Sequence, residues 1–358
     1  MSNWDDLYKN GYADFEGDFG KEYEYVKSDV LVSIICMTYN HEKYVEQALK
    51  GLVSQRTNFK YEIIVHDDAS TDNTAEIIRK YASMYPDLIQ PIIQEENKMS
   101  KGVKITRDII FPVCKGKYIA FCEGDDYWCF DDRLQKQVEA MENSPNISMC
   151  LAKVQYMDAE GNKLDDIMPR QCHNFKEGII PKDYYCEKVW IYGAYFHTSS
   201  YLMRRDLILW SFKSKATLRM NGDQVWLRIA SMLGDVYFLN EIVACRRMLT
   251  SNSFNKWFAD AKDDVKAKYL LNEAEGYAIF DSETNREFHK YSVIAIYRKL
   301  EFGIPYDEKR VKAIAKLSNA KLCDFRPYGT AKDKALYLLI KYLTGPFHRI
   351  MAIKRRHK

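Results

Sequence analysis

Three carboxylates follow directly on an apolar segment. The stretch YIAFCEGDDYW, residues 118–128, places Glu123, Asp125 and Asp126 almost side by side. Their negative charges repel one another, so this arrangement costs stability unless a cation, a hydrogen-bonded ligand or water offsets it. Mg²⁺ and Mn²⁺ bind carboxylate and phosphate oxygens together. We therefore expect a divalent ion and a nucleotide diphosphate here, with a solvated turn that caps the next helix as the alternative.

Two other polar segments follow apolar runs in the same way. TYN, residues 38–40, comes after LVSIICM, and DDASTDNT, residues 67–74, comes after YEIIVH. Each alone is ordinary loop and helix-cap composition. No GxxxxGK[ST] or GxGxxG motif follows the first apolar run, which disfavours P-loop and dinucleotide-cofactor binding.

The elements that position these segments alternate between two kinds. Short apolar runs predict strands at 31–37, 61–66, 88–93 and 117–122. Apolar stripes with helical spacing predict helices at 45–52, 75–85, 103–113 and 131–142. Alternation of this kind indicates an α/β fold with a mostly parallel, doubly wound sheet and a ligand crevice at the carboxyl ends of the strands. The three polar loops then share one rim.

Composition bounds the class of protein. The 358 residues suffice for one large α/β domain with an additional segment, and 47% hydrophobic with 29% charged residues is typical of a globular chain. A net charge of +3 does not favour nucleic acid as a partner. The nine cysteines form no CxxC pair, which indicates a reducing cytoplasm. We expect no signal peptide, and no run approaches the roughly 20 apolar residues that span a membrane.

The ordered series of motifs resembles a known family. VSIICMTYNHEKYVEQAL, YEIIVHDDASTDNT, TRDIIFPVCKGKYIAFCEGDDYW and DRLQKQV are similar, in order and spacing, to the inverting family 2 glycosyltransferases of the GT-A (Rossmann-like) fold. The resemblance covers about residues 30–250. It implies a nucleotide-diphosphate sugar donor, a UDP-sugar in the first place, bound with Mn²⁺ or Mg²⁺.

The resemblance also implies roles for individual residues. Its nucleotide-sugar positions correspond to Thr38, Tyr39, Asn40, Asp67, Asp68, Arg107, Glu123 and Asp125. The metal positions correspond to Asp125 and Asp126. Glu123 stands where aspartate is commoner in the family, so its role stays open.

A base that deprotonates the acceptor hydroxyl is expected further along the chain. Asp223, in RMNGDQVWLRIA, comes just before a predicted helix with an apolar stripe and matches the catalytic base of the family. The amino end of a helix favours the ionised carboxylate that a base requires. A plain helix-capping aspartate explains this position equally well without the resemblance.

The segment WIYGAYFHTSS is similar to the acceptor side of the family. Sugars stack on aromatic rings, so Trp190, Tyr192, Tyr195 and His197 are candidate acceptor contacts, with core packing as the alternative for most of them. Many relatives carry a histidine in the stretch that corresponds to ACRRMLTSNS. Here Met248 occupies that neighbourhood, which leaves a third metal ligand open.

The chain divides into three parts by these signals. Residues 1–29 form an N-terminal extension, and 30–250 form the glycosyltransferase domain, with a nucleotide-sugar half (30–130) and an acceptor half (131–250). Residues 251–358 form a helical region with a basic, amphipathic tail. Such a tail can lie on an anionic membrane surface or be an ordinary docked helix. We expect a cytoplasmic protein, with attachment to the inner face of the membrane as an open alternative.

The sequence therefore predicts a metal-dependent inverting glycosyltransferase. It would transfer a sugar to a hydroxyl of a glycan or polyprenyl-linked acceptor, in bacterial surface polysaccharide assembly. Two other classes stay open: a metal-dependent nucleotide-sugar phosphohydrolase that uses water as nucleophile, and a catalytically silent nucleotide-binding protein.

Overall fold

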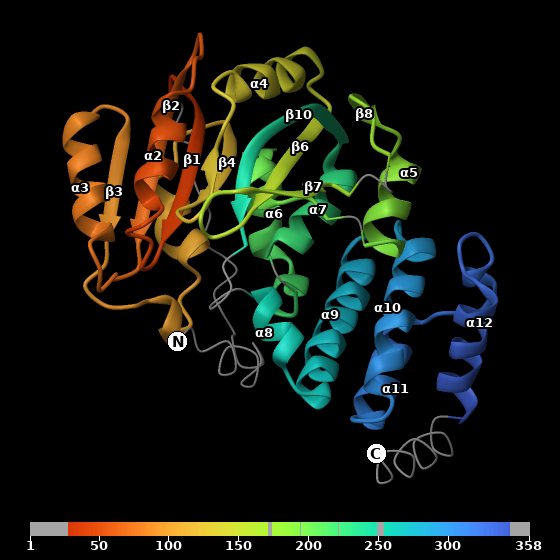
Figure 1. Cartoon of the computed structure of the whole chain (residues 1–358). Coiled ribbons are helices and arrows are strands. Elements are labelled where there is room, and N and C mark those ends of the chain that lie inside the picture. Colours follow the sequence, from red (N-terminus) through yellow and green to blue (C-terminus); the bar gives the residue numbers. More distant parts are fainter. Residues whose placement is uncertain (1–27, 171–173, 194, 221, 249–253, 344–358) are drawn as a thin grey trace.

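A computed structural model describes residues 28–170, 174–193, 195–220, 222–248 and 254–343 (Figure 1). At its centre is a mixed sheet with the strand order β3-β2-β1-β4-β9-β6-β10-β5, to which β7 and β8 add by pairing with β6 and β10. The strands are β1 (Val30–Thr38), β2 (Lys60–Asp67), β3 (Ile89–Ile93), β4 (Tyr118–Glu123), β5 (Tyr127–Trp128), β6 (Ile147–Met157), β7 (Lys163–Met168), β8 (Gly178–Ile180), β9 (Leu202–Arg204) and β10 (Asp235–Arg247).

The described α-helices lie around and beside this sheet (Figure 1). They are α2 (Val45–Val53), α3 (Thr74–Met84), α4 (Arg133–Asn143), α5 (Lys182–Cys186), α6 (Arg205–Lys213), α7 (Gly222–Leu233), α8 (Phe254–Asp260), α9 (Asp263–Glu283), α10 (His289–Gly303), α11 (Glu308–Ser318) and α12 (Ala331–Leu338). The helix expected over 103–113 is instead a π-helical turn, η3 (Ile105–Ile110), followed by a 3-10 turn, η4 (Phe111–Val113). Pro112 lies in that second turn and cannot donate a backbone hydrogen bond to continue a helix.

The first four strands confirm the expected α/β fold class. β1 pairs in parallel with both β2 and β4, and β2 pairs in parallel with β3. The ladders bring Met37 beside Glu123 and Thr38 beside Asp67. The three polar loops predicted from the sequence therefore leave the sheet at the same edge.

The second half of the sheet is mixed. β9 pairs antiparallel with both β4 and β6, whereas β10 pairs in parallel with β6. The short β5, which comes directly after the carboxylate loop, pairs antiparallel with β10. This pairing brings the end of β10 next to Asp125 and Asp126. A doubly wound sheet with parallel strands alone would not contain this antiparallel contact.

Two hydrophobic layers cover the sheet. Apolar side chains of α2, α3 and α4 pack on one face of β1, β2 and β4 and include Val45, Leu49, Ile78, Leu134 and Val138. The other face packs against η3, α6 and α7, and the same continuous cluster extends into α9 and α10. The C-terminal helices therefore share a core with the helix that carries Asp223.

Helices α8 to α12 form a group beside the sheet domain (Figure 1). They correspond to the helical region expected at 251–358. The N-terminal residues 1–27 and the basic tail from 344, with Arg349, Lys354, Arg355, Arg356 and Lys358, lie outside the described residues. Of the helices that are described, none has the length and apolar character needed to cross a bilayer.

Candidate active site

The carboxylate loop begins at the last residue of β4. Glu123 ends the strand, and its neighbour Gly124 donates its backbone N–H to the Met37 carbonyl at 2.9 Å, which closes the loop onto β1. A Cβ atom at position 124 would lie 2.5 Å from Thr38 Cγ2 and 2.9 Å from His41 Nδ1. Only glycine leaves room for this close approach between the carboxylate loop and the TYN loop.

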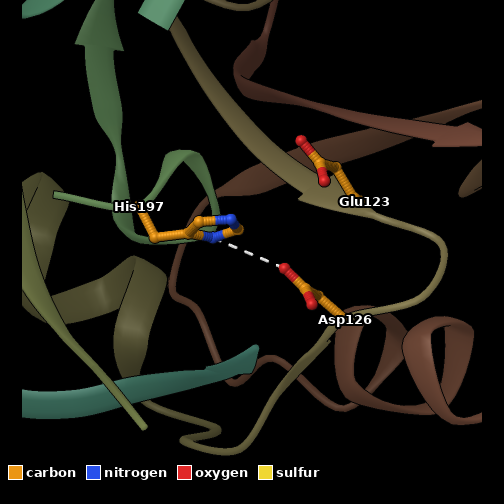
Figure 2. A group of neighbouring side chains, drawn as sticks. All are labelled: Glu123, Asp126 and His197. Carbon is orange, nitrogen blue, oxygen red and sulfur yellow. Dashed lines mark ion pairs between the residues drawn. The ribbon is translucent and has the colours of Figure 1, made fainter. Parts of the chain in front are cut away.

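Glu123, Asp126 and His197 form a group that can share one metal ion. Each offers one ligand atom, and these atoms all lie within 4.8 Å of one another. Figure 2 shows the three side chains converging from the end of β4, the loop after it and the segment before η7 (Thr198–Ser200). Asp125, which the resemblance placed at the metal, is not a member of this group among the described residues.

Hydrogen bonds fix the position of these ligand atoms. The backbone N–H of Arg247 donates to Asp126 Oδ1 at 3.0 Å, and the Ser199 hydroxyl donates to Asp126 Oδ2 at 2.9 Å. The Thr198 hydroxyl lies 3.4 Å from Glu123 Oε1. The turn η7 thus supports both carboxylates next to the imidazole that precedes it, as outer-shell partners do in metal sites.

The electrostatics of the group favour a bound cation. Burial, with the negative charges of Asp125 and Asp223, raises the pKa of Glu123 to about 7. Burial and the charges of Asp125 and Glu123 raise the pKa of Asp126 well above its usual range. Burial lowers the pKa of His197 well below its usual range, so the imidazole is neutral, the form that binds metals. A divalent ion would offset the repulsion that raises these two carboxyl pKa values.

Two adjacent arginines at the end of β10, which were not among the residues expected at the site, face the same loop. Arg247 donates from Nη1 to the Asp125 carbonyl at 2.6 Å. Burial opposes the charge of Arg246, but the facing groups, led by Tyr195 and Asp126, raise the pKa of its guanidinium. The signal in the sequence is an arginine doublet directly after an apolar strand, the same kind of transition that identified the carboxylates.

The nucleotide-side residues lie at the ends of β1 and β2. The Thr38 hydroxyl is 3.0 Å from Asp67 Oδ1, and both residues are buried. Asp68 accepts hydrogen bonds from the backbone N–H groups of Lys98 and Met99 at 2.8 and 3.0 Å. These bonds tie the loop after β3 to this edge of the sheet.

The other nucleotide-side candidates are more accessible. Tyr39 is 42% exposed. Asn40 has a left-handed backbone, with φ of 57°, and its Oδ1 accepts from the Thr71 N–H at 2.8 Å. Arg107, on η3, forms an ion pair with Asp108 at 2.7 Å.

Asp223 lies in the first turn of α7 and not before the helix. Its Oδ2 accepts a hydrogen bond from the Tyr195 hydroxyl at 2.9 Å, and its Oδ1 accepts from the Gln224 N–H at 2.8 Å. Burial raises the pKa of Asp223, against the lowering effect of these two hydrogen bonds. The ring of Tyr195, whose hydroxyl binds Asp223, lies 6.4 Å from the His197 ring, which brings Asp223 close to the metal group, and its charge contributes to the raised pKa of Glu123.

The four candidate acceptor residues separate in the structure. Tyr195 and His197 lie at the site. Trp190, in contrast, is 3% exposed, and its ring packs against Tyr277 and Phe280 of α9 and Phe288 in the turn before α10. Its side chain therefore belongs to the hydrophobic core and is not accessible to an acceptor sugar. Tyr192 is 56% exposed and lies beside Lys188.

Comparison with known proteins gives a family and relatives for part of the chain. The model of the family described as Glycosyl transferase family 2 matches residues 33–210. An uncharacterized protein of Mycobacterium tuberculosis is 39% identical over 138 residues, which is 38% of this chain and 39% of the relative. The UDP-Glc:alpha-D-GlcNAc-diphosphoundecaprenol beta-1,3-glucosyltransferase WfaP of Escherichia coli is 37% identical over 112 residues, 31% of this chain and 41% of WfaP.

The alignments are partial. The chain spans 39% and 41% of the lengths of these two relatives. Among solved structures, TarS 1-349 of S. aureus in complex with UDP-GlcNAc is similar to 87% of this chain and 90% of the TarS chain, with a TM-score of 0.48 and 18% identity. The family match ends before Asp223, so the part of the site on α7 depends on the geometry described above.

Proposed function

We propose that this chain, which belongs to glycosyltransferase family 2, transfers a sugar from a nucleotide-diphosphate donor to an acceptor hydroxyl. The reaction would use a divalent metal ion and would invert the configuration of the anomeric carbon. The observation that carries the proposal is the convergence of Glu123, Asp126 and His197, with Asp223 linked to this group through Tyr195. A hydroxyl that loses its proton there can attack a sugar whose diphosphate is held at the metal group.

The chemistry of the donor set fits a divalent metal. Two carboxylate oxygens and one neutral imidazole nitrogen suit an octahedral ion that completes its coordination with phosphate oxygens. Because imidazole is a poorer partner for Mg²⁺ than oxygen ligands are, we expect Mn²⁺ to support activity better than Mg²⁺. When bound, the ion would offset charge on the leaving diphosphate.

The protein's own residues would divide the remaining work. Arg246 and Arg247 provide positive charge next to the carboxylate loop, where the diphosphate would lie. Asp125, outside the metal group, stays available for the ribose. Asp223 would accept the proton of the acceptor hydroxyl, while the Tyr195 hydroxyl holds its Oδ2 in place. The direct displacement that follows inverts the anomeric carbon.

We infer a UDP-sugar as donor. The site offers Thr38, Asp67 and Asp68 at the ends of β1 and β2, with the accessible Tyr39 beside them for stacking on a base. In this arrangement the Asp68 carboxylate contributes indirectly: it binds the backbone N–H groups of Lys98 and Met99 and so fixes the loop after β3 beside the nucleotide. The name of WfaP, which states UDP-Glc as its donor, supports the same choice.

We infer a glycan or lipid-linked glycan as acceptor, in polysaccharide biosynthesis. The name of WfaP states a diphosphoundecaprenol-linked acceptor, and such a lipid lies in a membrane. A protein that acts on it from the cytoplasm has to reach the inner face of the bilayer. Exposed Leu338 and Tyr342, close to Lys334 and Lys341 in the chain, suit a peripheral contact with anionic lipid.

The proposed reaction is tested by donor turnover. Release of the nucleoside diphosphate is measured: UDP from UDP-glucose, UDP-N-acetylglucosamine and UDP-galactose, and GDP from GDP-mannose. Each donor is tested with Mn²⁺, with Mg²⁺ and with a chelator. A synthetic lipid-diphosphate-linked N-acetylglucosamine is present or absent. We expect release that depends on both Mn²⁺ and the acceptor, and a product whose anomeric configuration is opposite to the donor's.

Other results would favour the other two classes. Release at a comparable rate without the acceptor would indicate a phosphohydrolase. Calorimetric binding of UDP, without turnover of any donor, would indicate a nucleotide-binding protein that does not catalyse transfer.

A further inference from the structure

A buried arginine lies between α7 and the C-terminal helices. Arg228, on α7, is 2% exposed. A buried charge costs several kcal/mol unless it is compensated. In the described part of the chain, the guanidinium donates to the Tyr277 hydroxyl at 2.8 Å and lies over the rings of Trp190 and Tyr277, at 4.9 and 4.4 Å, and its charge lowers the pKa of Asp223.

The same guanidinium holds the first turn of α7. Its Nη1 donates to the Gln224 carbonyl at 2.6 Å and to Gln224 Oε1 at 3.0 Å. Gln224 in turn donates its N–H to Asp223 Oδ1 at 2.8 Å. A continuous series of hydrogen bonds therefore runs from Tyr277 on α9, through Arg228 and Gln224, to the carboxylate of Asp223.

Helix α9 also contacts the chain that leads into α7. A Cβ atom on Gly276 would lie 2.3 Å from Met220 Cγ, so the backbone of α9 touches that side chain directly. Glu275 forms an ion pair with Arg219 at 3.3 Å, and Glu283 accepts from the Ser214 hydroxyl at 2.6 Å. The segment that precedes Asp223 is thus attached to α9 at several points.

Electrostatics connect α9 with Asp223 as well. Burial is the main cause of the raised pKa of Asp223, and the negative charge of Glu273, on α9, adds to it. Glu273 itself is held by Lys299 at 2.6 Å. Helix α9 therefore lies close enough to Asp223 to act on it through both hydrogen bonds and charge.

We propose that α9 is part of the catalytic apparatus: Tyr277 and Arg228 are positioning residues that set the orientation of the Asp223 carboxylate. This inference rests on the proposed function, in which Asp223 is the base. It gives the C-terminal helices a role in catalysis, which their sequence did not reveal. Because small misplacements of reacting groups cost about a hundredfold in rate per ångström, loss of one bond in this series affects turnover more than binding.

The test compares two matched substitutions in the full-length protein. Tyr277→Phe removes the hydroxyl that accepts from Arg228 but keeps the ring. Tyr297→Phe removes a hydroxyl from another buried tyrosine of the same helices, whose ring packs on Phe325 and Tyr337. For each variant, kcat and the KM for UDP-glucose are measured with Mn²⁺ and the lipid-linked acceptor, next to Asp223→Asn.

We expect Tyr277→Phe to lower kcat roughly tenfold at unchanged donor KM, and Tyr297→Phe to leave both unchanged. If Tyr277→Phe equals Tyr297→Phe while Asp223→Asn is inactive, the positioning role is wrong and the proposed base stands. If Asp223→Asn transfers at the wild-type rate, the base assignment itself is wrong.

A substrate-free measurement gives an independent result. Hydrogen exchange is followed by mass spectrometry for a peptide covering 222–228 and for one covering 45–53 in α2. We expect Tyr277→Phe to speed exchange in the first peptide and not in the second, and Tyr297→Phe to change neither. Unchanged exchange at 222–228 in Tyr277→Phe would overturn the proposal even if no donor is turned over.

Discussion

His197 Nδ1 lies 3.4 Å from Asp126 Oδ2, and both side chains are almost completely buried. The two residues come from distant segments, the loop after β4 and the stretch before η7. Their contact places an imidazole nitrogen next to the Asp126 carboxylate. From the sequence alone, that carboxylate could be grouped only with its chain neighbours Glu123 and Asp125. It therefore defines where a metal ion would lie.

Replacement of His197 tests this contact. We expect His197→Gln to raise the Mn²⁺ concentration required for half-maximal UDP binding by at least about tenfold, because one ligand is lost. Isothermal titration calorimetry of UDP at a series of Mn²⁺ concentrations measures the change. His289→Gln, in the C-terminal helices, is the control and should leave the Mn²⁺ requirement unchanged. An equal requirement in both variants would remove His197 from the metal group.

Gly124 tests the close approach of the two loops. Gly124→Ala should lower the free energy of unfolding by about 1–3 kcal/mol, since the added Cβ meets Thr38 and His41 at 2.5 and 2.9 Å. Gly222→Ala is the matched control, because its Cβ would meet the Trp226 ring at an ordinary 3.6 Å. Urea unfolding of both variants gives the comparison. A Gly124→Ala protein as stable as the control would contradict the tight approach.

His289 makes stability depend on pH. Its Nδ1 lies 2.7 Å from Asp281 Oδ2 and its Nε2 lies 3.1 Å from Asp324 Oδ2, and the hydrogen bond that it donates to Asp281, ahead of the opposing effect of burial, raises its pKa. A raised pKa means that the folded state binds the proton more tightly, so the stabilisation is complete below the ordinary histidine pKa of about 6.5 and is lost as pH rises through the folded value.

The pH dependence is measured by unfolding at a series of pH values. We expect the wild type to lose stability relative to His289→Gln as pH rises above about 6.5, with a difference of about 1.5–3 kcal/mol at low pH. A difference between the two proteins that does not change with pH would show that the pKa of His289 is the same in the folded and unfolded states.

Much of the fold could be predicted from the sequence because its signals are local. The runs before TYN, DDAST and EGDDYW are short, apolar and β-branched, and each becomes a parallel strand of the sheet. Pro91 cannot donate a hydrogen bond to a central ladder, and the strand that contains it, β3, lies at the edge of the sheet. The antiparallel pairing of β5 with β10 depends on a contact between distant residues, which no local pattern reveals.

The site was only partly predictable for the same reason. Glu123 and Asp126 are neighbours in the chain, so their proximity follows from the sequence. The place of His197 beside them depends on how η7 packs, and a single histidine in an aromatic stretch gives no such signal. Trp190 shows the converse: it has the residue type of a sugar contact, but Phe280 on α9 and Phe288, just before α10, pack against it, and both lie far along the chain.

The central claim is that the metal group and Asp223 have separate tasks in one transfer reaction. Calorimetric binding of UDP, with Mn²⁺ and with chelator, together with sugar transfer, tests it most directly in the wild type, Asp126→Ala and Asp223→Asn. We predict that both variants lose transfer by at least about a hundredfold, and that only Asp126→Ala loses the gain in UDP affinity that Mn²⁺ provides. Equal loss of Mn²⁺-dependent UDP binding in both variants would contradict this division of roles.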